Sequence, residues 1–473
     1  MFTFSRDVFF YMEFTLFVSM FLLVSLIVIP RQILGWWAHR KLARGELFMQ
    51  YPMQKSAGGV THFMPDYLED HAVMHESLRL MCASYEKWTD KYAIVCIIDA
   101  ADIYPEEGIE LAKIAKQYDA HVFMTNARSK RKNLRNGVRW AKDPEAKGKV
   151  LEAAVEWAKD RGLLYEFSAF HDSDTVPTTP NDDIVGELLR PFADPKIGGV
   201  TTAQRIRNPD TPLLQVLDWL EDSRIGSSMA AGTLFGQVGC LPGRLYMIRS
   251  EIIVGWMDQL VEHYWNVPFL KSTFPFVGMR RVQLHAGDDR EMTLRVEQLG
   301  YHTVMNPRAT VVTSMPKRLR QINRIFRRWA TSSQWLTFIS TKYSWFRKQW
   351  FVMYQYYTDL LLTLITVFLV GRWFWLLFFS EREPLMPLFF LIVFSFLGTM
   401  LTFGSRQLWH LVRHPRRLMV LPMFVVLVTW WQFIRFQALF TPGRISVWGS
   451  RKGADESKGE VWFIPFEEFV CPA

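Results

Sequence analysis

Apolar residues are concentrated near the two ends of the chain. Residues 14–29 carry no charge, and three more apolar stretches follow at 360–370 continuing to 373–379, at 385–403 and at 418–434. Roughly 20 mainly apolar helical residues cross a hydrocarbon core. The pattern therefore predicts an N-terminal membrane anchor and a C-terminal bundle of about three membrane helices. The region between them is mixed and charged like a soluble domain.

The central region alternates between β-rich runs and segments with helical spacing. Residues 92–98 form an apolar run that ends at Asp99, and residues 106–118 then show a helical pattern. Strand-like runs recur at 121–125, before a basic turn, and at 164–170, before an acidic turn. Repeated strand and helix units predict an α/β domain with a mostly parallel sheet, which binds its ligands at the carboxyl ends of the strands.

The composition fits a protein that lies partly in a membrane. Hydrophobic residues make up 49% of the 473 residues, whereas the 21% of charged residues are too many for a chain wholly in lipid. The scattered Cys82, Cys96, Cys240 and Cys471 show no paired or metal-type spacing, which favours a reducing compartment. The first apolar stretch lacks a basic leader and a small-residue cleavage site, so we expect a retained anchor.

Basic residues flank the predicted spans and indicate their orientation. They follow the first stretch and fill the loop before the last one: Arg31, Arg40, Lys41, Arg44, Arg406, Arg413, Arg416 and Arg417. The positive-inside rule places both flanks in the cytosol. Four full spans would put the basic tail after residue 440 outside, whereas its charge favours the inside, so the side of the tail stays open.

A segment just before the C-terminal spans combines arginines with apolar side chains. Arg318, Arg320, Arg324, Arg327 and Arg328 alternate with Leu319, Ile322, Ile325, Phe326 and Trp329. This pattern is typical of basic amphipathic helices at a bilayer surface. An ordinary solvated helix with a basic face explains the same pattern.

Two acidic motifs carry the candidate chemistry. Asp172 and Asp174 follow a predicted strand, where two carboxylates one residue apart can hold a divalent cation that neutralises a diphosphate, although acidic turn caps look the same. Asp288 and Asp289 in GDDR precede a helical pattern at 291–299, so they are either helix caps or a source of the general base for an acceptor hydroxyl.

Two further features suit a phosphate-bearing sugar substrate. Lys130 lies in the basic turn SKRKNLRNG between two acidic strand tips, which favours a phosphate ligand over a nucleic-acid patch or a solvated turn. Trp329 offers a flat apolar face on which a sugar can stack, or it anchors the interfacial helix.

The ordered set of motifs from Met64 to Trp329 resembles the processive family 2 glycosyltransferases, namely the hyaluronan, chitin and cellulose synthases. Within this group the chain is most similar to fungal type 2 glycosyltransferases of the capsule and cell-surface kind. The resemblance implies a GT-A type Rossmann-like nucleotide-sugar domain inserted between the anchor and the membrane bundle. The corresponding boundaries are 1–31 for the anchor, 32–315 for the catalytic domain, 316–350 for interface helices, 351–440 for the bundle and 441–473 for the tail.

The resemblance also assigns roles to individual residues. It implies nucleotide-sugar contacts for Tyr67, Glu69, Asp99, Lys130, Asp172 and Arg328, metal binding for Asp172 and Asp174, an acceptor site at Gly243, Arg244 and Trp329, and Asp289 as the base with Asp288 as its neighbour. The chain departs from the family pattern at Leu68, where the family has asparagine, at Ser129, where it has glycine, and at Ile325, where the QxxRW motif has glutamine.

These features together predict an inverting, multi-pass membrane glycosyltransferase that uses Mg²⁺ or Mn²⁺. The expected partners are a UDP-sugar, a polysaccharide acceptor and membrane lipid, with no nucleic acid, and a homo-oligomer is left open. The plasma membrane with the catalytic domain in the cytosol is the expected location. Two alternatives remain at this point: a transferase with a dolichol-phosphate type lipid-linked acceptor, and a non-enzymatic membrane scaffold that binds nucleotide.

Overall fold

A mixed β-sheet forms the centre of the large domain. The computed structural model describes residues 6–66, 70–98, 105–124, 147–254, 264–265, 282–283, 287–341, 343–379, 385–403 and 410–440. Within them the strand order of this sheet is β3-β2-β1-β4-β7-β6-β10-β5. The strands are β1 (Val60–Asp66), β2 (Tyr92–Ile98), β3 (His121–Met124), β4 (Phe167–His171), β5 (Thr175–Pro177), β6 (Ile197–Ile206), β7 (Leu245–Arg249) and β10 (His302–Thr313).

Most of these strands run in one direction, as the strand and helix pattern predicts. Strand β7 is antiparallel to both β4 and β6, and β5 is antiparallel to β10, whereas the other neighbouring pairs are parallel. The predicted strand at 92–98 matches β2 residue for residue, whereas the run predicted at 164–170 begins three residues too early for β4. The carboxyl ends of the parallel strands share one edge of the sheet, where the acidic turn after β4 lies.

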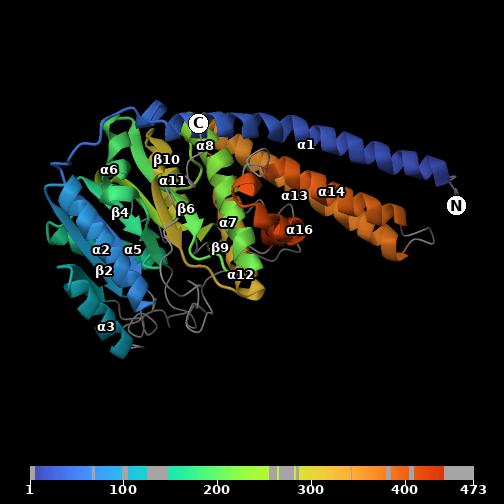
Figure 1. Cartoon of the computed structure of the whole chain (residues 1–473). Coiled ribbons are helices and arrows are strands. Elements are labelled where there is room, and N and C mark those ends of the chain that lie inside the picture. The colour runs from blue at the N-terminus through green and yellow to red at the C-terminus, as the bar shows by residue number, and fades with distance from the viewer. Residues whose placement is uncertain are drawn as a thin grey trace.

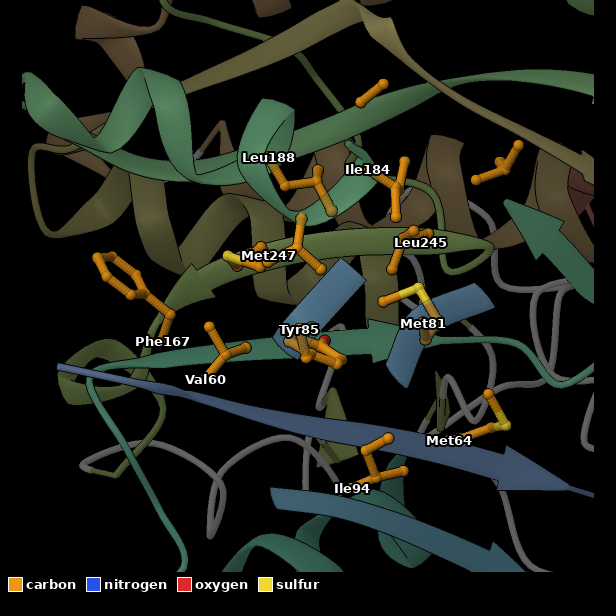
Figure 2. Close-up of a cluster of buried hydrophobic side chains, with 14 of the residues drawn as sticks. Val60, Met64, Met81, Tyr85, Ile94, Phe167, Ile184, Leu188, Leu245 and Met247 are labelled. Carbon is orange, nitrogen blue, oxygen red and sulfur yellow. The ribbon is translucent and has the colours of Figure 1, made fainter. Parts of the chain in front are cut away.

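Helices cover both faces of the sheet, because successive strand side chains point to opposite sides. On one face, Ile94 and Cys96 of β2 pack with α2 (His71–Trp88), α3 (Pro105–Lys116) and α6 (Ile184–Leu189). Figure 2 shows part of this cluster, with Tyr85 and Met81 of α2 against the sheet. On the other face, Val95 of β2 packs with α5 (Lys147–Asp160), α9 (Ser250–Val254) and α11 (Asp288–Gln298).

Long apolar helices lie side by side beyond the sheet domain (Figure 1). They are α1 (Arg6–Ala43), α13 (Trp350–Phe379), α14 (Leu385–Phe403) and α16 (Leu421–Phe440), the last preceded by the 3-10 turn η8 (Pro415–Val420). In the described part of the chain, three helical segments are long and apolar enough to cross a membrane, Tyr11–Met49, Trp350–Phe379 and Pro415–Phe440, and Leu385–Leu397 is a shorter apolar helix. Phe17, Trp373, Phe390 and Phe394 form an aromatic core between α1, α13 and α14.

The first helix continues well past the predicted anchor. The anchor was expected at residues 1–31, and the helix that contains it, α1, runs on through Pro30 to Ala43. Its second half packs against η4 (Ile225–Met229) and α8 (Ala230–Leu234) of the sheet domain. A Cβ atom on Gly35 would lie 2.3 Å from the Ser227 carbonyl oxygen, so only glycine allows this approach. Tertiary packing against the sheet domain therefore accompanies the extension of this helix to Ala43.

The arginine-rich segment forms helix α12 (Leu319–Ser340), which packs along α16. The rings of Phe326 and Trp431 stack with centroids 4.1 Å apart, and the Trp431 indole N–H donates to Asn323 Oδ1 at 3.1 Å. Arg327 donates to the side-chain oxygen of Gln437 at 2.7 Å. The aromatic side of α12 is thus buried against a helix of the bundle, which brings Trp329 between the bundle and the sheet domain.

Hydrogen bonds and ion pairs to buried aspartates of α7 (Pro212–Arg224) connect the segment before α16 to the sheet domain. Asp218 receives two bonds of 2.7 Å from Arg205 and one of 2.6 Å from Arg417. Although burial alone would raise the pKa of Asp218, these guanidinium groups hold it well below its ordinary value. His410 donates toward Asp222 at 3.0 Å and stacks on Trp219. The basic loop therefore lies on the same side of the bundle as the sheet domain.

Candidate active site

The turn after β4 places the first acidic motif at the carboxyl edge of the sheet. Asp174 is buried and Asp172 is half-buried. The Thr175 N–H closes the turn by donating to the Asp172 carbonyl at 3.0 Å, and the Asp172 N–H donates to the Arg244 carbonyl at 3.1 Å. The Ser314 N–H donates to the Asp174 carbonyl at 3.3 Å. Neighbouring strands thus hold the backbone of this turn at both of its aspartates.

The second acidic motif forms the start of α11. Asp288 and Asp289 lie within the first helical turn, where the helix dipole favours negative charge. Neither aspartate is the N-cap residue, because Gly287 occupies that position, although the Asp289 carboxylate does accept from an N–H of the first turn. Gly287 has φ +111°, and a Cβ atom there would lie 2.7 Å from Cβ of Ser332 in α12. The glycine therefore lets the GDDR turn sit directly against α12.

The carboxylate of Asp289 is held by backbone groups. Its Oδ1 accepts from the Arg290 N–H at 2.8 Å, and its Oδ2 accepts from the Gly243 N–H at 3.4 Å. The Thr293 hydroxyl donates to the Asp289 carbonyl at 2.7 Å and accepts from the Leu241 N–H at 2.7 Å. These bonds join the GDDR turn to the loop at 239–244, which contains two of the predicted acceptor residues.

Arg290 connects the GDDR turn and the loop at 239–244 to helix α12. Its guanidinium donates to the Gly239 carbonyl and, at 2.5 Å, to the Thr337 hydroxyl of α12. Gly239 also lies close to α13, because a Cβ atom there would be 3.6 Å from the Gln355 side-chain oxygen. The base candidate and the first membrane helix after α12 are therefore linked through one arginine and one loop.

Arg244 and Trp329, both predicted at the acceptor site, are in contact. The guanidinium carbon of Arg244 lies 5.9 Å from the centroid of the Trp329 ring, within range of a cation–π interaction. The same guanidinium pairs with Glu221 at 2.9 Å and donates to Gln204 at 3.1 Å. Arg328, the predicted donor contact, is half-buried beside Trp329 in α12. The structure thus brings together the loop at 239–244 and Trp329 of α12, about 85 residues apart in sequence.

Two residues near these motifs were missed by the sequence analysis. The Tyr246 hydroxyl is buried with no hydrogen-bond partner among the described residues, and burial together with Asp288, Asp289 and Asp172 raises the pKa of its phenol well above the ordinary value. Arg207, 4% exposed, lies at the same edge of the sheet, and burial lowers its pKa against the attraction of Asp70 and Asp174. Neither belongs to a motif, so only a predicted strand end could have pointed to them.

Four other predicted site residues, Tyr67, Glu69, Asp99 and Lys130, lie outside the described residues. The described strands β1 and β2 end at Asp66 and Ile98, immediately before the first and third of these positions. Both strands run parallel to β4, so the chain leaves all three strands at the edge of the sheet that carries Asp172.

The two aspartates after β4 fit a divalent cation that is completed by its substrate. Among the described residues no group of three or more His, Cys, Asp or Glu side chains could enclose a metal ion by itself. Mg²⁺ is commonly bound through one or two carboxylates together with substrate phosphates and waters. Asp172 and Asp174 match that requirement, because they supply oxygen ligands one residue apart on a fixed turn.

Several proteins of known family are similar to this chain in sequence. "Hyaluronan synthase 3" of Mus musculus is 30% identical over 201 residues, which cover 40% of this chain and 33% of that protein. A "Type 2 glycosyltransferase" of Zymoseptoria tritici is 28% identical over 57% of this chain and 56% of its own length. One from Gibberella zeae is 24% identical over 81% of this chain and 73% of its own length. The first of these matches thus spans about a third of the relative's length.

Among solved structures, the mannosyltransferase PcManGT from Pyrobaculum calidifontis, in complex with GDP-Man and Mn²⁺, is 14% identical with a TM-score of 0.44. The match covers 88% of this chain and 97% of that one. The family model described as "Glycosyltransferase like family 2" matches residues 72–332, more than half of the chain. The resemblance seen in the motifs is therefore confirmed, and this chain belongs to the glycosyltransferase-like family 2.

Proposed function

We propose that this protein is a membrane-bound inverting glycosyltransferase that transfers a sugar from a UDP-sugar to a growing polysaccharide and extrudes the product. The observation that carries the proposal is the joining of separate motifs at one edge of the sheet. The turn of Asp172 bonds to Arg244, the GDDR carboxylate of Asp289 bonds to Gly243, and Arg244 contacts Trp329. Donor, base and acceptor candidates are thus adjacent.

Asp289 is the general base in this proposal. Backbone N–H groups of Gly243 and Arg290 fix its carboxylate in place while it remains able to accept a proton. The acceptor hydroxyl gives its proton to Asp289 as the hydroxyl oxygen attacks the anomeric carbon, and the bond from that carbon to the UDP oxygen breaks. A single displacement inverts the anomeric configuration and needs no covalent enzyme intermediate. Asp288, one residue earlier, adds negative charge beside the base.

The donor side of the site is assigned to the acidic turn and to basic groups. Asp172 and Asp174 would hold Mg²⁺ or Mn²⁺, which when bound neutralises the charge of the UDP diphosphate. Arg328 and Lys130 contact the diphosphate, and Arg207 adds positive charge near Asp174. The nucleoside lies against Tyr67, Glu69 and Asp99 by likeness to the family motifs.

The acceptor side adjoins the membrane bundle. Trp329 stacks the acceptor sugar, and Gly243 and Arg244 shape the loop beneath it. Helix α12 carries Trp329 and packs along α16, so the acceptor end of the site meets the bundle through which the product leaves. We place the sheet domain in the cytosol, because the basic loop before α16 packs on it. The plasma membrane is the proposed location by likeness to the family motifs.

The experiment that tests the proposal is UDP release by the purified full chain in detergent. Several UDP-sugars are supplied with and without Mn²⁺, and any product is sized and digested with specific glycosidases. Metal-dependent UDP release and a long product from one or two donors are expected. A short product in the organic phase would instead identify a lipid-linked acceptor, and Mn²⁺-dependent nucleotide binding without turnover in the presence of added oligosaccharides would identify a scaffold.

A further inference from the structure

A buried chain of hydrogen bonds ends at the acidic turn after β4. The Tyr85 hydroxyl of α2 lies 2.7 Å from Nδ1 of His62 in β1, and Nε2 of His62 lies 3.3 Å from Nδ1 of His171 in β4. Nε2 of His171 lies 3.0 Å from the Thr175 carbonyl oxygen. All three side chains are fully buried on the face of the sheet that α2 covers, and Tyr85 lies among apolar side chains there (Figure 2).

The partners of each atom determine where the protons lie. A carbonyl oxygen only accepts, so Nε2 of His171 carries a proton and donates to Thr175. Burial, followed by the neighbouring His171, holds the pKa of His62 well below its ordinary value, so its ring is neutral. A neutral His62 that accepts from the Tyr85 hydroxyl at Nδ1 carries its proton on Nε2 and donates it to His171 Nδ1. Each link then has one donor and one acceptor in a single direction.

The last link of this chain spans the acidic turn. His171 immediately precedes Asp172 and Thr175 immediately follows Asp174, so the bond between them joins the two ends of the turn. The Thr175 N–H to Asp172 carbonyl bond closes the turn from inside, and Thr175 also donates its hydroxyl to Asp174 Oδ1 at 3.2 Å. Thr175 is therefore held by His171 while it holds both aspartates.

We infer that Tyr85, His62 and His171 are positioning residues that set the two carboxylates of Asp172 and Asp174 for a divalent cation carrying a nucleoside diphosphate. The inference rests on the proposed function, because that function supplies the ligand. Residues that orient metal ligands through hydrogen bonds commonly change metal affinity by about tenfold to a hundredfold when they are removed. A cluster that merely stabilises the packing of α2 on the sheet would change thermal stability and leave the affinity of the turn unchanged.

The test measures Mn²⁺ affinity in the presence of UDP, without any sugar donor, by electron paramagnetic resonance on the full chain in detergent. His171→Leu removes both hydrogen bonds of the imidazole at similar volume, and we expect Mn²⁺ to bind about tenfold to a hundredfold more weakly. His171→Gln keeps one acceptor and one donor, so it is expected to recover most of the affinity. Tyr85→Phe, which removes only one hydroxyl, is expected to weaken binding less and in the same direction.

Ser168→Ala is the matched control. Ser168 lies in the same strand, is equally buried, and shares a 2.7 Å bond with Ser250 outside the chain of His171. We expect it to lower thermal stability and to leave the Mn²⁺ affinity unchanged. Equal Mn²⁺ binding by wild type and both the His171→Leu and Tyr85→Phe variants would overturn the inference alone. Absence of Mn²⁺ binding in the wild type with UDP would instead overturn the proposed function.

Discussion

Arg244 and Trp329 join the loop before β7 to the helix that borders the membrane bundle. The guanidinium of Arg244 lies 5.9 Å from the centre of the Trp329 ring while the same group pairs with Glu221 of α7 at 2.9 Å. Arg224 also pairs with Glu221, at 2.7 Å. Helix α7 in turn bonds to the loop before α16 through Asp218 and Arg417. One buried arginine thus contacts both Trp329 of α12 and Glu221 of α7.

Arg244→Gln is expected to lower the thermal midpoint of the protein in detergent. Glu221 is largely buried, and among the described residues it would keep Arg224 as its cationic partner. The free energy of unfolding should therefore fall by less than the roughly 3–5 kcal/mol lost when a buried charge has no partner left. Arg224→Gln is the matched variant, because the Arg224 side chain is 35% exposed against 9% for Arg244. A larger fall in the thermal midpoint for Arg224→Gln than for Arg244→Gln would contradict the prediction that the more buried arginine contributes more to stability.

Asp289→Asn is expected to reduce sugar transfer by about a hundredfold or more, since an amide cannot accept the proton of the acceptor hydroxyl. The asparagine side-chain oxygen can still accept from the Gly243 N–H, so the loop should keep its position. UDP release is the measurement, with Mn²⁺-dependent UDP binding expected to be unchanged. Asp210→Asn, which alters an exposed ion pair with Lys317, is the control. Full transfer activity of Asp289→Asn would exclude Asp289 as the base.

Gly287→Ala is expected to impair both stability and transfer. Alanine at φ +111° is strained by roughly 1–2 kcal/mol, and its Cβ atom would lie 2.7 Å from Ser332, so the GDDR turn would be displaced from α12. Gly300→Ala provides the strain without the collision, because Gly300 has φ +88° and nothing within 4 Å of a Cβ atom. The difference between the two variants in thermal midpoint and in UDP release therefore measures the effect of the contact with Ser332. Equal activity of the two variants would show that contact with α12 does not position Asp289.

Glu297→Gln is expected to remove a pH dependence of stability. Burial raises the pKa of Glu297 to about 8, whereas an unfolded glutamate titrates near 4.3. Between these values the folded protein keeps a proton that the unfolded chain releases, so stability falls as pH rises, by at most about 1.4 kcal/mol per pH unit. The advantage of Glu297→Gln over wild type in thermal midpoint should therefore grow from pH 5 to pH 8. Parallel curves for the two proteins would refute the raised pKa.

Tyr246→Phe is expected to leave stability unchanged or to raise it, which is unusual for a fully buried position. Within the described part of the chain the Tyr246 hydroxyl has no hydrogen-bond partner, and an unsatisfied buried polar group costs about 1–3 kcal/mol. Tyr85→Phe is the matched comparison, since the Tyr85 hydroxyl lies 2.7 Å from His62 and its loss leaves a buried nitrogen unpaired. Thermal midpoints of the two variants should move in opposite directions, and a drop for Tyr246→Phe would reveal a bond to that hydroxyl.

The hydrophobic pattern predicted those strands and helices that can be recognised from their own residues alone. The run YAIVCII matches β2, because a strand covered on both faces of the sheet is a nearly continuous run of apolar, β-rich side chains. The apolar stretches at the two ends likewise predicted helices α1, α13, α14 and α16. The apolar stretch alone did not show that α1 continues to Ala43, because the packing of Gly35 on Ser227 comes from a segment almost 200 residues away.

The sequence by itself determined the family, the α/β character of the central domain and the apolar helices at both ends, because each depends on short motifs or on local hydrophobic periodicity. Only the tertiary structure decided that Gly243 bonds to Asp289, that Arg244 contacts Trp329, and that His62 and His171 lie beneath the acidic turn. These contacts join strands and helices far apart along the chain. Hydrogen bonds and burial act through space, so such relationships exist only once the sheet has brought the segments together.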